Sequence, residues 1–316
     1  MKMVNKAQIA LNSTTMTGRI FVCHFIVLLY LLPGCKEKEI SSPLYGTAPS
    51  DSIPVYRFAT PEFNNPGDVM ADYQPLMDYL NDNIKSVRFV LETSKDYANF
   101  EKKYQNGTPE IIRPNPWQTI QAIQSGYDVI LTTGDPAGLK GLFIVRKDAE
   151  INKPSDLIGK TVSYSAPTAI AATVMTQYFL YQNGINVNRD VKNIYVGSHE
   201  SALLNVYMKN SSAAGSTSIP WHDFQKNHPP EASKLKVAWE TESLIMGSIM
   251  IRRDVDSAIR RQVTDCLLQL PETEKGRALL AGIHTKYFLR ATNKDYDVVK
   301  QYIQRFERDV RKIEVK

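Results

Sequence analysis

The chain has 316 residues, of which 43% are hydrophobic and 22% are charged, and its formal net charge is +5. These proportions are ordinary for a globular protein and exclude a low-complexity or collagen-like chain. The basic balance is small and uneven along the chain, so it does not by itself indicate a nucleic-acid partner.

The first 34 residues have the composition of an export signal. Three basic residues and no acidic residue precede Cys35, and residues 20–32 are a largely apolar run. This run is shorter than the roughly 20 residues that a membrane-spanning helix needs, so a signal-peptide core is expected. The run ends in LPGC at residues 32–35, which resembles a bacterial lipobox and predicts lipidation of Cys35. The alternative is an ordinary cleaved signal with a chance cysteine.

Residues 35–52 are polar with Ser, Pro and Gly, which predicts a flexible tether. Removal of residues 1–34 leaves 282 residues and lowers the net charge from +5 to +2, because Lys2, Lys6 and Arg19 leave. The isoelectric point near 8.9 is therefore partly a property of the signal. Cys266 would be the last free cysteine, so we expect no internal disulfide. The protein is expected outside the cytoplasm, anchored by lipid to a bacterial membrane.

Short apolar strands alternate with segments of helical period along the rest of the chain. This rhythm predicts an α/β fold with mostly parallel sheets and helices on both faces. In such sheets ligands bind beyond the carboxyl ends of the strands. The expected strands are at 55–59, 87–91, 129–131, 142–145, 161–164, 194–196 and 236–239, and expected helices are at 72–81, 97–104, 118–123, 168–180, 201–208 and 299–310.

Two similar segments indicate how the chain is divided. Residues 141–150 and 247–256 both read as a strand that ends in two basic residues and an aspartate. They bracket a βαβα block of about 100 residues, so we expect two lobes joined by two crossings. The expected bounds are 53–148 and 246–316 for the first lobe and 149–245 for the second. A single large doubly wound domain is the alternative.

The most informative segment is 160–180, which reads as a strand, a polar turn and a helix. Residues 161–164 are β-branched or aromatic, and 165–168 have turn chemistry. A strand that leads into a helix places free backbone N–H groups and a positive dipole end at the edge of a sheet. The sequence therefore predicts a place to hold an anion here.

Several motifs, in order along the chain, resemble one family. They are YQPL at 73–76, DLIGKTV at 156–162, LxxxGI at 180–185 and GSHESA at 197–202. The chain resembles the phosphonate/phosphite-binding group of ABC-transporter solute-binding proteins from about residue 55 to 311. The resemblance implies a two-lobed type II periplasmic-binding-protein fold that closes around a small ligand, with no cofactor.

The sequence departs from the family pattern at two places. Phosphonate binders usually carry a Ser-Thr-Ser run at the start of the second-lobe helix, where this chain has Ala169-Ile170-Ala171. A family aspartate that can pair with a ligand amine is matched by residues 213–215, which contain no carboxylate. The expected ligand is therefore an oxyanion held with fewer charged contacts than an aminoalkylphosphonate needs.

Each candidate ligand contact also has a structural alternative. Thr168 and Ser218 could instead cap helices, Asn115 caps the 118–123 helix in either role, and Trp117 could pack between layers. His199 could be a structural hydrogen bonder, and Glu62 and Asn64 are weaker candidates. The candidates are Asn115, Trp117, Tyr164, Ser165, Thr168, Ala169, His199, Thr217, Ser218 and Trp221.

No catalytic or metal-binding motif is found. The sequence has no HExxH, GxSxG or Walker motif and no paired Cys/His spacing, so we expect neither an enzyme nor a metal site. The leading hypothesis is a monomeric, membrane-anchored solute-binding protein that delivers a small anionic ligand to an ABC permease. The alternatives are a receptor that presents ligand to a membrane histidine kinase, and an exported α/β enzyme.

Overall fold

The computed structural model describes residues 53–61, 66–135 and 138–314, which fall in one compact unit. The expected signal, Cys35, the tether, Glu62 and Asn64 lie outside these residues. Within the described part of the chain, no helix is both long enough and apolar enough to cross a membrane.

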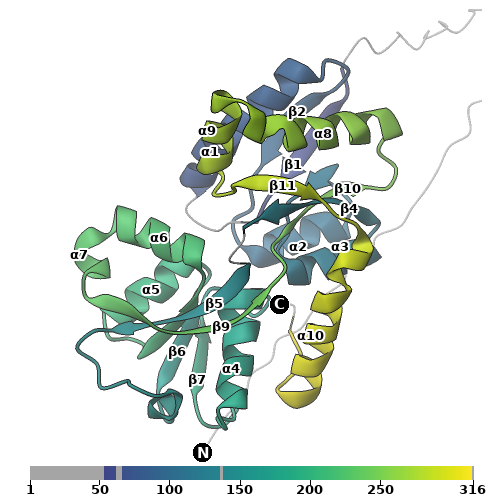
Figure 1. The fold of residues 1–316 in the computed structure, drawn as a ribbon. Helices are drawn as coiled ribbons and strands as arrows, with labels where there is room; N and C mark the ends of the chain where they lie inside the picture. Colours follow the sequence, from purple (N-terminus) through teal and green to yellow (C-terminus); the bar gives the residue numbers. More distant parts are fainter. Residues whose placement is uncertain (1–52, 62–65, 136–137, 315–316) are drawn as a thin grey trace, which may run out of the picture. The chain divides into compact units, whose positions relative to one another are not determined.

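The first lobe is built on a six-stranded sheet in the order β11-β4-β10-β3-β1-β2. Its helices cover both faces of the sheet (Figure 1). The strands are β1 (Val55–Ala59), β2 (Arg88–Glu92), β3 (Ile111–Ile112), β4 (Tyr127–Gly134), β10 (Ser248–Arg252) and β11 (Tyr287–Arg290). The helices are α1 (Pro66–Asn83), α2 (Tyr97–Gln105), α3 (Pro116–Gln124), α8 (Ser257–Gln269), α9 (Glu274–Gly282) and α10 (Asp297–Asp309).

The second lobe is built on a five-stranded sheet in the order β7-β6-β8-β5-β9. A π-helical turn, Ile170–Met175, runs directly into α4. The strands are β5 (Leu139–Arg146), β6 (Thr161–Tyr164), β7 (Lys192–Tyr195), β8 (Ala213–Ser216) and β9 (Leu235–Leu244). The helices are α4 (Thr176–Gln182), α5 (His199–Tyr207), α6 (Ser218–Asn227) and α7 (Pro229–Ala232), and short 3-10 turns occur at Pro154–Leu157, Leu270–Glu272 and Asn293–Tyr296.

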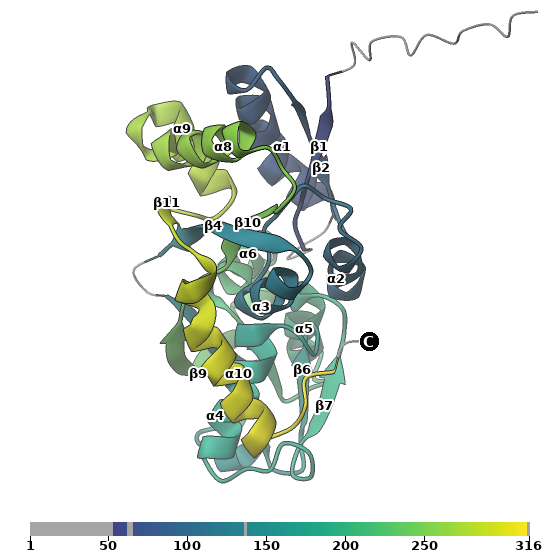
Figure 2. The ribbon, with the colours of Figure 1, turned by 90° about the vertical axis from the view of Figure 1, so that its right-hand side faces the viewer.

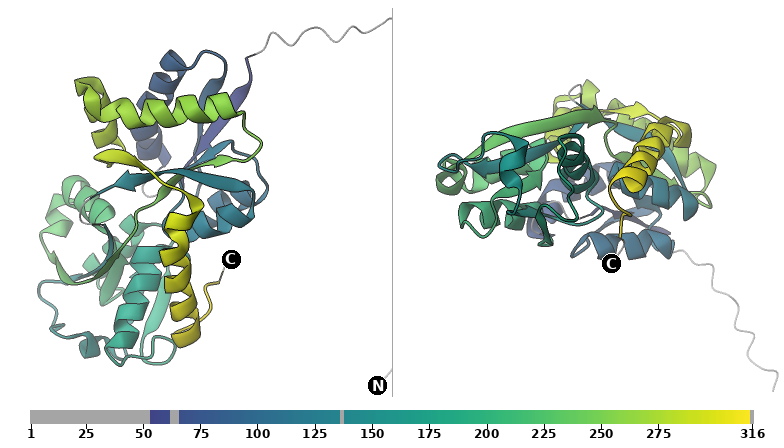
Figure 3. Two further views of the ribbon diagram at one scale, coloured as in Figure 1. Left: turned by 45° about the vertical axis from the view of Figure 1, so that its right-hand side comes forward. Right: turned by 90° about the horizontal axis from the view of Figure 1, so that it is seen from below.

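The sheets differ from the sequence expectation in two respects. Strand β5 pairs with β8 and β9 in the second sheet, so the expected first-lobe bound at residue 148 is wrong for this strand. The sheets are also mixed rather than mostly parallel, because β4, β5, β9, β10 and β11 take part only in antiparallel pairs. The strands flanking both crossings pair antiparallel with their neighbours. Figure 3 shows the two lobes that these crossings join.

The repeated strand motif plays the same role in each lobe. Arg146 ends β5 and donates to Tyr207 O at the end of α5, at 2.6 Å. Arg252 ends β10 and donates to Gly107 O beyond α2, also at 2.6 Å. Each guanidinium also pairs at 2.7 Å with an aspartate two residues further on, Asp148 or Asp254. The sequence echo therefore reflects one local device used in both sheets.

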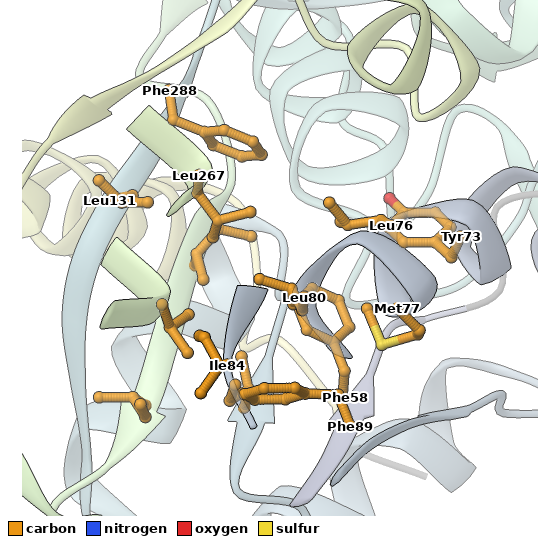
Figure 4. Packing of buried hydrophobic residues seen from close by; sticks show 14 of the residues in the cluster. Phe58, Tyr73, Leu76, Met77, Leu80, Ile84, Phe89, Leu131, Leu267 and Phe288 are labelled. Carbon is orange, nitrogen blue, oxygen red and sulfur yellow. The ribbon is translucent and has the colours of Figure 1, made fainter. Parts of the chain in front are cut away.

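The first lobe has one apolar core cluster of its own and the second lobe has two, and a further cluster spans both lobes. In the first lobe, α1 places Leu76, Met77 and Leu80 against Phe58 and Phe89 (Figure 4). The cluster shared by the lobes includes Phe100, Ile112 and Trp117 of the first and Val174 and Met175 of the second. Because the members of this shared cluster are buried, the two sheets are held together by apolar contacts as well as by the connecting chain.

Helix α10 lies beside α4 of the second lobe in the views of Figure 1 and Figure 2. The sequence spacing predicts an apolar face formed by Val299, Tyr302, Ile303, Phe306 and Val310. The first four are buried, and Val310, just beyond the helix, is half-buried. The Tyr178 ring of α4 meets the Tyr302 ring edge-on at 5.5 Å between centroids. Helix α10, which belongs to the first lobe, thus packs along α4 of the second lobe.

Candidate functional site

A cavity of about 100 Å³ lies between the lobes. One water needs roughly 10–15 Å³ of such space, so the cavity has room for a ligand of several heavy atoms. The first lobe contributes residues of α1, the start of α2, the β3–α3 turn and Met246-Gly247. The second lobe contributes residues 169–172 and the starts of α5 and α6.

The β3–α3 turn supplies the first helix start. Asn115 Oδ1 accepts from the Gln118 backbone N–H at 2.9 Å, and Gln118 Oε1 accepts from the Asn115 N–H at 3.1 Å, so Asn115 caps α3 as predicted. Its Nδ2 donates across the lobe boundary to Thr168 O at 3.3 Å. This turn therefore forms part of the cavity wall and part of the lobe interface.

The second lobe supplies three further helix starts, at Ile170, His199 and Ser218. Each follows a strand of the parallel set β6, β7 and β8, so the three starts gather at one sheet edge. The first turn of a helix has backbone N–H groups without intrahelical acceptors and carries a positive dipole end. Ala169, Ala171 and Ala172 line the cavity, and their small side chains let a ligand approach this backbone.

Arg113 is a cavity residue that the sequence analysis missed. It is 8% exposed, lines the cavity and lies 5.6 Å from the centroid of the Tyr73 ring, which also lines it. Burial is the main cause that raises the pKa of Tyr73, so the phenol stays neutral. A signal was present, since Arg113 directly follows the buried pair Ile111-Ile112, at the carboxyl end of a strand.

His199 lies at the start of α5, 2% exposed, on the cavity wall. Its Nε2 is 3.4 Å from Tyr97 Oη and 3.5 Å from Ser165 Oγ. Burial lowers its pKa to about 4, so the imidazole is neutral near pH 7. Its Nδ1 has no hydrogen-bond partner in the part of the chain that the structure describes. A neutral ring with one unused nitrogen can donate to or accept from a ligand.

Thr168 neither lines the cavity nor caps the helix. Its Oγ1 donates to Glu101 Oε1 of α2 at 2.6 Å, and Gln118 Nε2 donates to the same oxygen at 3.1 Å. Glu101 is 2% exposed, and burial is the largest cause that raises the pKa of its carboxyl group. The helix cap position is Ala169, which makes no side-chain cap bond. The Thr168 hydroxyl is thus used in a buried contact between the lobes.

The structure brings some of the ten predicted contacts to the cavity and leaves others away from it. Trp117 packs in the cluster shared by the lobes, Tyr164 packs in the second-lobe core, and Trp221 stacks on Phe224 at 6.2 Å. Ser218 is exposed and is the first residue of α6, whose cap is Thr217 without a side-chain bond. Of the ten predicted contacts, four line the cavity: Asn115, Ala169, His199 and Thr217.

Comparison with known proteins identifies similar molecules. Residues 58–296 match the family model described as the periplasmic substrate-binding protein of phosphonate ABC transporters. A binding protein component of an ABC phosphonate transporter from Pseudomonas aeruginosa is 15% identical with a TM-score of 0.76, and covers 82% of this chain and 88% of its own. PhnD1 of Prochlorococcus marinus, solved with methylphosphonate, is 16% identical with a TM-score of 0.73, and the match covers 81% of this chain and 99% of PhnD1. The aliphatic sulphonate binding protein SsuA of Escherichia coli is 13% identical with a TM-score of 0.59, and the match covers 84% of this chain and 91% of SsuA.

Proposed function

The chain belongs to the family of periplasmic substrate-binding proteins of phosphonate ABC transporters, and from this premise we propose that it is a lipid-anchored member. It captures a small phosphonate-like oxyanion between its lobes and delivers it to an ABC permease. The observation that carries the proposal is the convergence of Arg113 with the starts of α3, the 170–175 turn, α5 and α6 on one interlobe cavity.

The cavity chemistry fits an oxyanion bound mainly by backbone groups and one cation. The hydroxyl run that the family resemblance implies is replaced by Ala169-Ile170-Ala171, so the N–H groups of this turn would take the oxygens. Arg113 would supply a planar, permanently charged donor suited to bidentate contact with a phosphonate. His199 and Tyr97 would contribute neutral polar contacts at the second-lobe wall.

Binding is tested with residues 36–316 by isothermal titration calorimetry against methylphosphonate, phosphite, phosphate and methanesulphonate. We expect at least one of these anions to bind and to raise the melting temperature. Arg113→Gln should weaken that binding by about tenfold or more, because a hydrogen bond to a charged group contributes roughly 1.5–3 kcal/mol. Arg253→Gln, which alters a half-exposed arginine, is the control and should bind normally. If the wild-type protein binds none of the four anions, the proposed ligand class is wrong.

Anchoring depends on Cys35, and it has a separate test. Growth of the host with a radiolabelled or alkyne-tagged fatty acid should label the wild-type chain and leave Cys35→Ser unlabelled. The variant should then be released from the membrane fraction, since one polar tether would no longer carry acyl chains. Labelling that persists in Cys35→Ser would exclude this residue as the anchor.

A further inference from the structure

The end of α9 adopts a conformation that usually requires glycine. His284 follows the helix with φ 52°, its N–H donates to Ala281 O at 3.1 Å, and the next N–H, of Thr285, donates to Leu280 O at 2.9 Å. This is a left-handed helix-terminating turn, in which a side chain is disfavoured and glycine is the common residue.

Other helices of the chain end in the same way but use glycine. Gly107, Gly126 and Gly184 follow α2, α3 and α4 with φ between 64° and 94°. Lys209, after α5, has φ 65°, and its exposed side chain pairs with Asp148, which does not line the ligand cavity. Among the described residues, Lys209 and His284 are the non-glycine residues with positive φ. The backbone at residue 284 therefore does not need a histidine.

The imidazole of His284 lies where the two lobes meet. Its Nε2 is 3.6 Å from Asp223 Oδ1 of α6 in the second lobe and 3.9 Å from Asp72 Oδ2 of α1 in the first. Asp223 is only 8% exposed, while the His284 side chain is 34% exposed, so the contact is buried on the α6 side and reaches solvent on the α9 side. The contact therefore joins α6 of the second lobe to the end of α9 in the first.

His284 also separates two hollows. It lines the interlobe cavity together with Asp72, and it lines an adjoining pocket that contains Arg277 and Lys286. The two hollows share Thr133, Met246 and His284. The imidazole is thus part of the wall that the interlobe cavity shares with the adjoining pocket.

We propose that His284 is a positioning residue that holds α6 of the second lobe against α1 and α9 of the first, and so keeps the ligand cavity closed. The inference rests on the proposed ligand-binding function, since it assigns the unfavourable backbone conformation to a side chain needed for binding. Its contact with Asp223 places Thr217, Ile219 and Pro220 at the cavity wall.

The test compares His284→Gly with Lys209→Gly in the whole chain, purified in detergent. Both changes place glycine at a positive φ, so neither should lower the melting temperature of the ligand-free protein by more than about 2 °C. His284→Gly should weaken methylphosphonate binding by about tenfold, while Lys209→Gly should leave it unchanged. Asp223→Asn should cause a similar loss, and the double variant His284→Gly/Asp223→Asn should lose no more than either single variant. Unchanged affinity in His284→Gly, or additive losses in the double variant, would overturn the proposal.

A ligand-free measurement separates this inference from the proposed function. In a Cys266→Ser background, spin labels at the exposed residues Lys234 and Gln262 report the distance between the lobes by pulsed electron resonance. His284→Gly should broaden this distance distribution toward larger values, and Lys209→Gly should not. If methylphosphonate fails to bind the wild type while His284→Gly still opens the lobes, the ligand class is wrong and the role of His284 stands. An unchanged distribution contradicts the role of His284 whatever the ligand. Should His284→Gly fold poorly, His284→Asn, which tolerates the same φ, gives the same comparison.

Discussion

Thr168 shows how a partner distant in sequence decides the role of a residue. Its hydroxyl and the Gln118 side-chain amide both donate to the buried Glu101 carboxyl group at the lobe boundary. Burying such a group is unfavourable unless it is hydrogen-bonded, so each of these contacts offsets part of that penalty. The hydroxyl predicted for a ligand is therefore engaged by the protein itself.

Thr168→Val should lower the free energy of unfolding by about 1–3 kcal/mol, because it leaves Glu101 with one fewer donor at constant side-chain shape. Urea unfolding measures the change. In a Glu101→Gln background the cost of Thr168→Val should shrink, since a neutral amide is buried more cheaply than a carboxylate. Equal costs in the two backgrounds would show that the Thr168–Glu101 contact contributes little.

His199 gives the protein a pH dependence of known sign. Burial holds its folded-state pKa at about 4, below the unfolded value of about 6.5, so the unfolded chain binds the proton more readily. The neutral ring therefore stabilises the fold fully above about pH 6.5, and this contribution falls by roughly 3 kcal/mol as the pH drops to 4. His199→Gln should flatten the stability profile between these values, measured by urea unfolding. The exposed His222→Gln should leave the slope as it is in the wild type.

Residue roles were predictable where they depend on neighbours in sequence. The Asn115-Pro116 pair identified the cap of α3 because an N-cap is decided within one helical turn. The role of Thr168 was not predictable, because its acceptor is 67 residues away. His284 carried no local signal at all, since glycine is the residue expected at a left-handed helix end.

At the scale of elements, the π-helical turn Ile170–Met175 is held in place by glycines of the second sheet. A Cβ at Gly215 of β8 would overlap Ala172 O and the Tyr164 ring, and one at Gly141 of β5 would overlap Ala171 O. The backbone that lines the cavity can approach the sheet only because these positions have no side chain. The strand–helix connection was evident from sequence, but this close approach and the π-helical start were not.

Gly215→Ala should displace the 171–172 backbone or strain the sheet, because the added methyl group has no room. We expect a loss of about 1–3 kcal/mol in the free energy of unfolding, together with weaker binding of the cavity ligand. Calorimetric titration and urea unfolding measure the two effects. Gly282→Ala is the matched control, since its Cβ would lie 3.7 Å from the nearest atom, Asp72 O. Normal affinity in Gly215→Ala would indicate that the turn does not form the ligand site.

The order of strands along the chain was predicted better than their assignment to lobes. Apolar runs located β5 and β10, but the matching motifs at their ends suggested that both lie in the first lobe. Strand β5 joins the second sheet because it pairs with β8 and β9. Pairing partners depend on contacts distant in sequence, such as Phe143 with Gly215 and Trp239, which alternation of apolar residues does not reveal.

For the whole molecule, the C-terminal segment connects the lobes on the side of α4. Arg311 Nε donates to Gln177 Oε1 at 2.9 Å and Arg311 Nη2 donates to Tyr195 Oη at 3.0 Å. Asn188 Nδ2 donates to Val310 O at 2.8 Å. With the shared cluster and the contacts of Glu101 and His284, these bonds tie the second lobe to the first at several separate places. Such coupling favours a single unfolding transition for both lobes.

Arg311→Met should weaken this coupling, because it removes both charge-assisted hydrogen bonds from Arg311 to the second lobe while keeping an unbranched apolar side chain. We expect a loss of about 1–3 kcal/mol and a broadened or divided transition in differential scanning calorimetry, as the second lobe begins to unfold before the first. Arg308→Met is the control. Arg308 forms an ion pair with the adjacent Asp309, and its side chain is 71% exposed. Such a surface pair contributes about 0–1 kcal/mol, so the control should keep a single sharp transition. A sharp transition in Arg311→Met as well would mean that the shared apolar cluster, rather than the C-terminal segment, couples the lobes.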